Sequence, residues 1–196
     1  DHEYALVICN HHILLDGWSM PLLTRDLLVF YATRGDDAAL PPVRSFGAFL
    51  DWVAHHVAAT SVAARQQALA GLQGPTLLAG ASRVREVSTP AAELRTSLDE
   101  ERTARLSAMS RDLGITVNTI LQAAWGIVLG RMVGSDDVVF GTTVSGRPVD
   151  LAGVESMVGL FINTIPVRVR AENTDTVADM LTRVQSEQAG LLDHHH

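Results

Sequence analysis

Two residue types that often supply reactive groups are scarce in this chain of 196 residues. All 15 cationic side chains are arginine, which excludes a Schiff-base lysine and the lysine of a phosphate-binding P-loop. A single cysteine, Cys9, excludes an internal disulfide framework and any zinc or iron–sulfur site built on several cysteines. We therefore expect a protein of a reducing compartment, with a cytoplasmic location.

Long hydrophobic runs and a basic surface are also lacking. The most apolar stretch, residues 119–133, is short and interrupted by Gln122 and Arg131, so no membrane partner is expected. The chain begins Asp-His-Glu, which is not a basic leader. A net charge of −7 argues against a nucleic-acid partner. With 47% hydrophobic and 19% charged residues, the chain is expected to fold as one domain or two small lobes.

Hydrophobic periodicity predicts a mixture of strands and helices, and hence an α/β or mixed α+β fold class. Ser19 is expected to cap the first helix. The segment 117–133 is apolar around most of its circumference and is expected to be a buried central helix. Strands are predicted over residues 4–9, 92–98, 137–144 and within 159–169, and helices from Ser19 to the stop at Gly35 and over residues 46–58, 62–72, 100–113, 117–133 and 177–191.

The chain already opens on an apolar strand pattern, from which we expect it to be part of a longer protein. A polar, turn-rich stretch over residues 80–90 is the expected boundary between two lobes. The last residues, His194 to His196, are either native sequence or a clipped purification tag.

The segment that offers the most candidate catalytic side chains is HHILLDGWS, residues 11–19, which lies between a predicted strand and a predicted helix. Side chains alternate along a strand, so one of the two adjacent histidines can face a cavity while its neighbour is held in the structure. A cavity-facing imidazole can accept a proton or form a hydrogen bond near neutral pH. Asp16 can fix the loop, and Gly17 permits a positive φ and a close backbone approach.

Two other interpretations of this constellation compete with a catalytic one. A lone buried histidine is more often a satisfied core group than a catalyst. A zinc site is disfavoured, because adjacent histidines on a strand cannot easily share one ion and the sequence has no cysteine cluster. We therefore predict no metal site.

HHILLDGWS resembles the HHxxxDG active-site motif of the condensation domains of nonribosomal peptide synthetases, which are similar in fold to chloramphenicol acetyltransferase. VGLFINTIPVR, residues 158–168, resembles a later signature of the same family, GxFxNTxPxR. VFGTTVSGRP, residues 139–148, resembles the segment before that signature. Residues 46–52 are a weaker match, in which Phe46 replaces an opening tyrosine.

The resemblance implies a chloramphenicol acetyltransferase-like two-lobe sandwich that is incomplete in this chain. Residues 1–80 would form the end of the N-terminal lobe with the HHxxxDG motif. Residues 81–196 would form part of the C-terminal lobe with the GLFINTIP motif.

The implied reaction is formation of an amide bond between a carrier-bound donor acyl or peptidyl thioester and the amine of a carrier-bound acceptor amino acid. His12 would be the catalytic residue, facing a tunnel between the lobes. It would position the amine by a hydrogen bond and accept the proton late. His11, Asp16 and Gly17 would be structural residues at the active site. The arginine partner of Asp16 would lie either in the missing part of the lobe or at Arg147.

Four further residues are candidates for lining the tunnel or contacting substrate: Trp18, Ser19, Asn163 and Arg147. Asn163 could donate a hydrogen bond to the thioester oxygen or the tetrahedral intermediate. Its alternative role is to fix the loop before the Thr-Ile-Pro sequence.

No tightly bound cofactor is implied, because phosphopantetheine arrives on partner carrier proteins. The implied partners are the upstream and downstream peptidyl carrier proteins, the remainder of the condensation domain and an adjoining adenylation domain. Arg83 and Arg85 form a local basic cluster that could contact a carrier, with a solvated face as the alternative.

Three other functions stay open at this point. The chain could be a non-catalytic docking fragment for carrier proteins, or an acyltransferase that uses coenzyme A thioesters. Epimerisation domains share HHxxxD but usually continue into Ser-Trp-Arg. Here Gly17-Trp18-Ser19 follows instead, which favours peptide-bond formation.

Overall fold

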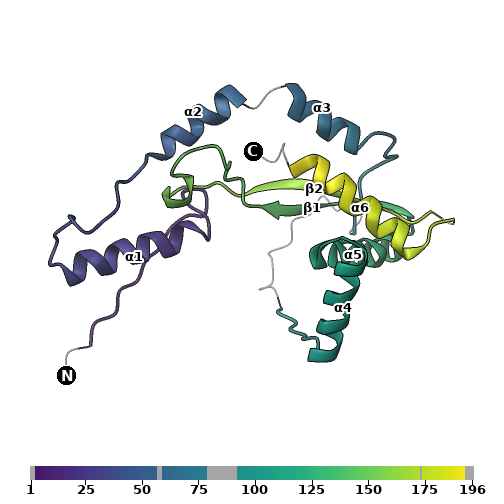
Figure 1. The fold of residues 1–196 in the computed structure, drawn as a ribbon, viewed down its shortest axis with the longest axis horizontal. Coiled ribbons are helices and arrows are strands. Elements are labelled where there is room, and N and C mark those ends of the chain that lie inside the picture. The colour runs from purple at the N-terminus through teal and green to yellow at the C-terminus, as the bar shows by residue number, and fades with distance from the viewer. Residues whose placement is uncertain (1–2, 57–58, 79–91, 173, 193–196) are drawn as a thin grey trace, which may run out of the picture. The chain divides into compact units, whose positions relative to one another are not determined.

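The computed structural model describes residues 3–56, 59–78, 92–172 and 174–192. In the described residues five α-helices precede the two strands and a sixth follows them, which confirms the mixed α/β class (Figure 1). The elements are α1 (Ser19–Ala32), α2 (Phe46–His56), α3 (Ala59–Ala68), α4 (Glu100–Asp112), α5 (Val117–Val133), β1 (Asp137–Val144), the 3-10 helix η1 (Val154–Ser156), β2 (Asn163–Arg170) and α6 (Val177–Leu192).

The chain divides into two compact units, each built from separate parts of the sequence. The first unit combines residues 1–61 with residues 143–164, and the second combines residues 62–142 with residues 165–194. The predicted lobe boundary over residues 80–90 lies outside the described residues. The division into lobes at residue 80 therefore stays a prediction, and so does the role of Arg83 and Arg85.

In the second unit, β1 and β2 pair in antiparallel fashion. The start of β1 lies opposite the end of β2, because the Ala171 N–H donates to the Asp136 carbonyl at 2.8 Å. The Arg168 guanidinium pairs with the Asp137 carboxylate at 2.6 Å across the two strands. This cross-strand ion pair fixes the register at one end of the ribbon.

The core of the second unit lies between this ribbon and helices α5 and α6, and α4 packs on α5. Gly126 of α5 sits against Val169 of β2, where a Cβ atom on the glycine would lie 2.5 Å from the valine side chain. The absence of a side chain at residue 126 therefore lets the helix approach the strand closely.

Local sequence explains where α4 and α5 begin and end. The Asp99 side chain accepts the Arg102 N–H before α4, and the Thr116 side chain accepts the Thr119 N–H before α5. Gly134 ends α5 in the left-handed conformation at φ +72°. These capping residues explain why the predicted boundaries of both helices agree with the structure.

The first unit has a smaller core of aromatic rings. Phe46 and Phe49 of α2 pack on Phe161, with ring centroids 5.1 and 4.6 Å from it. Val154 and Met157 complete this buried cluster. The segment just before β2 is thus held against α2 by apolar contacts.

The structure corrects four expectations. Residues 4–9 and 92–98 are not strands, and the sheet of the described residues contains β1 and β2 only. Both segments have the periodicity of a strand, but a strand also needs a neighbouring edge to pair with. Ser19 is not a helix cap, because α1 begins at Ser19 itself. Helix α5 is buried on one face only, with Trp125 48% exposed on the other.

Within the described residues, no single helix is both long and apolar enough to cross a bilayer. Helices α4 and α5 meet the length and composition criteria only as a pair, and they are bent by 104°.

Candidate functional site

The two histidines of the HHxxxDG motif lie in a tight turn just before α1. The Leu14 N–H donates to the His11 carbonyl at 3.0 Å, and the Ile13 N–H donates to Nδ1 of His11 at 3.1 Å. The His11 ring therefore stabilises the turn, in line with its predicted structural role. His12 is exposed, so its imidazole is open to a reactant in the described structure.

Asp16, 1% exposed, is the anchor of this turn. Its Oδ1 accepts the Ser19 N–H at 3.0 Å and lies 2.8 Å from the Ser19 hydroxyl. Its Oδ2 accepts the Phe161 N–H at 3.1 Å, and its own N–H donates to the Gly159 carbonyl at 3.1 Å. Asp16 thereby joins the HHxxxDG segment to the GLFINTIP segment.

These contacts keep Asp16 ionised. Burial alone would raise the pKa of Asp16, because it penalises the charged form. Hydrogen bonds from the Ser19 hydroxyl and from the Phe161 and Ser19 N–H groups, together with the charge of Arg147, outweigh burial and lower the pKa. The carboxylate is thus a charged acceptor at neutral pH.

The partner of Asp16 within the described residues is Arg147, the local one of the two predicted alternatives. Arg147 Nη2 lies 3.6 Å from Asp16 Oδ1, and both side chains are almost fully buried. Nη1 donates to the carbonyls of Val154 and Met157, the latter at 3.1 Å. The guanidinium carbon also lies 3.7 Å from the centroid of the Phe161 ring.

Burial lowers the pKa of Arg147 despite the charges of Asp16 and Glu155, which act in the opposite direction. A guanidinium stays protonated at neutral pH even so. The interior of the first unit therefore holds a charged pair whose members are both hydrogen-bonded.

Ser19 and Arg147 are predicted from sequence to line the tunnel, and their burial argues against that role. Ser19 is 0% exposed and Arg147 is 6% exposed, with contacts to neighbouring residues of the first unit. We therefore assign both to the scaffold beneath the histidine turn rather than to contact with substrate.

Gly17 and Trp18 lie on the exposed side of the turn. Gly17 does not adopt a positive φ, and a Cβ atom on it would meet nothing within 4 Å. The expected conformational reason for a glycine is therefore wrong in this structure. Trp18 is 53% exposed, and its indole N–H donates to the Glu155 carbonyl at 3.2 Å. Its tunnel-lining role stays a prediction.

Asn163 is half-buried at the start of β2, two residues after Phe161. Its Oδ1 accepts the Thr164 N–H at 2.8 Å. That contact supports the loop-fixing alternative, while contact with substrate stays a prediction.

Sequence reasoning missed two glycines that the site requires. A Cβ atom on Gly146, at φ +64°, would overlap the Phe161 carbonyl, and one on Gly159 would overlap the Phe46 ring. Both stand inside quoted motifs, GTTVSGRP and GLFINTIP. Their position in those motifs was therefore the available signal.

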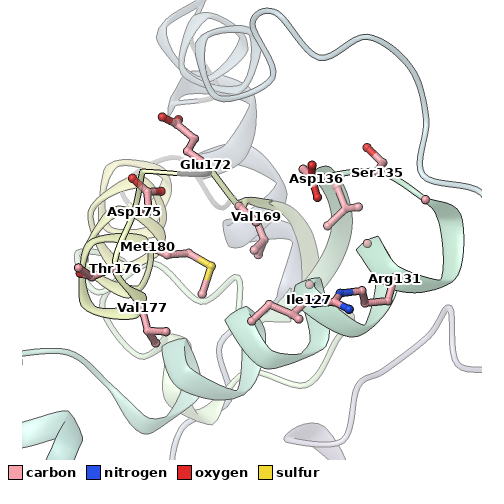
Figure 2. Close-up of a pocket in the computed structure, with 15 residues that line it drawn as sticks. Ile127, Arg131, Ser135, Asp136, Val169, Glu172, Asp175, Thr176, Val177 and Met180 are labelled. Carbon is pink, nitrogen blue, oxygen red and sulfur yellow. The ribbon is translucent and has the colours of Figure 1, made fainter.

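A separate cavity lies in the second unit, between the end of α5 and the start of α6 (Figure 2). Its lining includes the apolar side chains of Ile127, Val169 and Met180 and the charged side chains of Arg131, Asp136 and Glu172. None of the predicted site residues lines it. Within the described residues, no group of three or more histidine, cysteine or acidic side chains could hold a metal ion.

Comparison with known proteins identifies the family of this chain. The profile of the family described as "Condensation domain" matches residues 1–196. The chain is 41% identical over 196 residues to a linear gramicidin synthase of Brevibacillus parabrevis, covering 97% of this chain and 2% of that protein. It is 37% identical over 185 residues to a surfactin synthase of Bacillus subtilis (strain 168), covering 93% of this chain and 5% of that protein.

Among solved structures, the first condensation domain of the CDA synthetase is 26% identical, with a TM-score of 0.67. The match covers 94% of this chain and 42% of that one, so this chain spans less than half of a solved relative. This likeness confirms the predicted chloramphenicol acetyltransferase-like fold. The profile match over the whole chain, together with these relatives, establishes that the chain belongs to the condensation-domain family of nonribosomal peptide synthetases.

Proposed function

We propose that this chain contributes the catalytic histidine of a domain that forms amide bonds between two carrier-bound substrates. The observation that carries the proposal is the exposed imidazole of His12 on a turn anchored by the buried Asp16. An accessible imidazole on an anchored turn can hold the attacking amine in one orientation, and this reaction requires such an orientation.

In the proposed reaction, the acceptor amine attacks the carbonyl carbon of the donor thioester. A C–N bond forms, the C–S bond breaks, and the thiol leaves on the donor carrier. His12 accepts a hydrogen bond from the attacking amine and takes its proton late, after the C–N bond has formed. The sulfur that leaves then takes up this proton, so that the products are the amide and the free thiol. A deprotonated amine is a capable nucleophile, so orientation contributes more than base strength.

The substrates reach this site as thioesters on phosphopantetheine arms of upstream and downstream carrier proteins. In this proposal the arms approach from opposite sides, and Trp18, which is exposed beside the turn, contacts one of them. An adjoining adenylation domain selects the acceptor. The scarcity of cysteine supports a cytoplasmic location.

The test is a single substitution in a complete condensation domain that contains this sequence. His12→Ala should lower the rate of amide formation by roughly 100-fold or more, the usual contribution of a positioned acid–base group. His55→Ala is a matched control, because His55 is an exposed histidine of the same unit, on α2. An unchanged rate in His12→Ala would overturn the proposal.

Two further measurements define the role and the donor. An acidic limb of the pH–rate profile that survives unchanged in His12→Ala would remove His12 from the titration. Efficient turnover of a coenzyme A thioester in place of the carrier-bound donor would identify a coenzyme A-dependent acyltransferase instead.

A further inference from the structure

The hydroxyl of Ser19 lies where the two family motifs meet. Its Oγ is 2.8 Å from Asp16 Oδ1 and 2.9 Å from the Gly159 carbonyl oxygen. The Gly159 N–H donates to the same Oγ at 3.0 Å, and Arg147 Nη2 lies 3.5 Å away. Ser19 is 0% exposed, so water does not compete for these contacts.

This environment uses the full hydrogen-bonding capacity of a hydroxyl. A serine has one hydrogen to donate and two lone pairs that accept. The hydrogen has two acceptors within reach, Asp16 and the Gly159 carbonyl. The lone pairs face two donors, the Gly159 N–H and the Arg147 guanidinium. Alanine at residue 19 would leave the buried Gly159 N–H without this acceptor.

The contacts hold Gly159 from both sides of its peptide backbone. The Asp16 N–H donates to its carbonyl at 3.1 Å, while its N–H donates to Ser19 Oγ. A strand pair makes the same two-way contact through backbone groups alone. Here a side chain replaces one backbone acceptor, and it joins residues 140 positions apart.

We propose that Ser19 is a positioning residue that acts through the histidine turn. By fixing Asp16 to Gly159, its hydroxyl sets the place of the turn that carries His12 relative to the segment 159–163. Ser19 is fully buried, so it does not touch substrate itself. This inference rests on the proposed catalytic role of His12.

A double-mutant cycle in a complete condensation domain that contains this sequence tests the inference. With one carrier-bound substrate varied and the other saturating, Ser19→Ala should lower kcat about 10-fold and change KM by less than about twofold. In a His12→Ala background, the same change should alter the residual rate by less than about twofold. The reason is that Ser19 has no effect on the rate once the group it positions is gone.

A merely structural serine gives a different result. It would lower the rate by the same factor in both backgrounds, and that outcome would overturn the inference while leaving the role of His12 intact. An unchanged rate in Ser19→Ala would also overturn it. If His12→Ala alone leaves the rate unchanged, the proposed function and this inference fail together.

Two further variants serve as a control for the loss of a buried hydroxyl and as a substitute for Ser19→Ala in the double-mutant cycle. Ser110→Ala makes the same chemical change at a buried serine of α4, whose hydroxyl donates to the Ser107 carbonyl at 3.0 Å, and should leave kcat unchanged. Ser19→Cys keeps the shape of the side chain but replaces the oxygen with a larger atom that is a weaker donor and acceptor. It should give an intermediate kcat, and it replaces Ser19→Ala in the cycle if the alanine variant does not fold.

Discussion

Asp16 and Arg147 form a buried ion pair in which other groups satisfy most of the hydrogen-bonding capacity. Asp16 accepts from the backbone of Ser19 and Phe161, and Arg147 donates to the carbonyls of Val154 and Met157. A pair of this kind is costly to break on one side only, because the remaining charge stays buried. Substitution of either Asp16 or Arg147 alone is therefore expected to destabilise the turn that carries the two histidines.

Asp16→Asn should lower the free energy of unfolding by about 3 kcal/mol, because it leaves the charge of Arg147 buried without its partner. The new amide group also places a donor where the carboxylate accepted an N–H. Urea unfolding of the complete domain measures the loss. Asp37→Asn, at an exposed aspartate in the loop after α1, should change it by less than about 0.5 kcal/mol. Equal losses in the two variants would contradict this prediction.

The free energy of unfolding at low pH should depend on the ionisation of the same carboxylate, that of Asp16. The folded-state pKa of Asp16 lies below the ordinary aspartate value of 3.8, so its stabilisation is complete above that pH. It is lost as the pH falls through the lower folded-state pKa, since the unfolded state then binds more protons. The difference in unfolding free energy between wild type and Asp16→Asn should thus shrink below about pH 4.

Asp137 provides the comparison for that measurement. A hydrogen bond from Arg168 lowers the pKa of Asp137 against the opposing effect of burial. Protonation of Asp137 therefore also lowers the free energy of unfolding as the pH falls. Asp137→Asn should remove the contribution of Asp137 to the pH dependence of the unfolding free energy and leave the contribution of Asp16 unchanged. A pH-independent gap between wild type and Asp16→Asn would show that the ionised form of Asp16 gives no stability.

At the scale of elements, the crossing of α5 over β2 depends on a missing side chain. Gly126 faces Val169, and a Cβ atom there would lie 2.5 Å from the valine. Neither the strand nor the helix can shift without disturbing the buried cluster that they share with α6.

Gly126→Ala should therefore destabilise the second unit by about 1–3 kcal/mol through overpacking. Gly190→Ala in α6 is the matched control, because a Cβ atom at that exposed position meets nothing within 4 Å. The control should be neutral or stabilising by up to about 0.5 kcal/mol, since alanine favours helix. Thermal unfolding compares the two variants, and a neutral Gly126→Ala would refute the close crossing.

Elements with local signals were predictable, and those that need a distant partner were not. The caps at Thr116 and Gly134 bracket α5, so its bounds follow from local residues alone. Residues 4–9 have a strand pattern, but periodicity does not reveal whether a neighbouring strand is present. In the site, the HHxxxDG motif singled out Asp16, which is buried and hydrogen-bonded in the structure. The burial of Ser19 against Gly159 left no local signal, because the two are 140 positions apart.

At the scale of the whole molecule, many large apolar side chains of the described residues are exposed. Helix α5 has a stripe of large side chains at helical spacing on the face away from the core. Leu121, Trp125, Val128 and Met132 are 52%, 48%, 47% and 64% exposed. The chain spans 42% of a solved condensation domain. Surface of this kind drives association when it is left uncovered.

The 196-residue chain by itself should therefore self-associate at concentrations of roughly tens of micromolar. Trp125→Glu should shift it toward the monomer by placing a charge in the stripe. Ser186→Glu adds the same charge at an exposed polar position of another helix, α6, and should not shift it. Sedimentation velocity measures the distribution, and a monomer at all concentrations would contradict the prediction.

The two-sided hydrogen bonding of Gly159 also bears on how such synthetases can be recombined. A chimera whose crossover falls between residues 20 and 158 takes the serine from one parent and the glycine that it holds from another. Where the two parents differ in loop length or turn geometry, the exchange would break the contact even when both residues are present. Crossovers should therefore leave the two segments with a common origin.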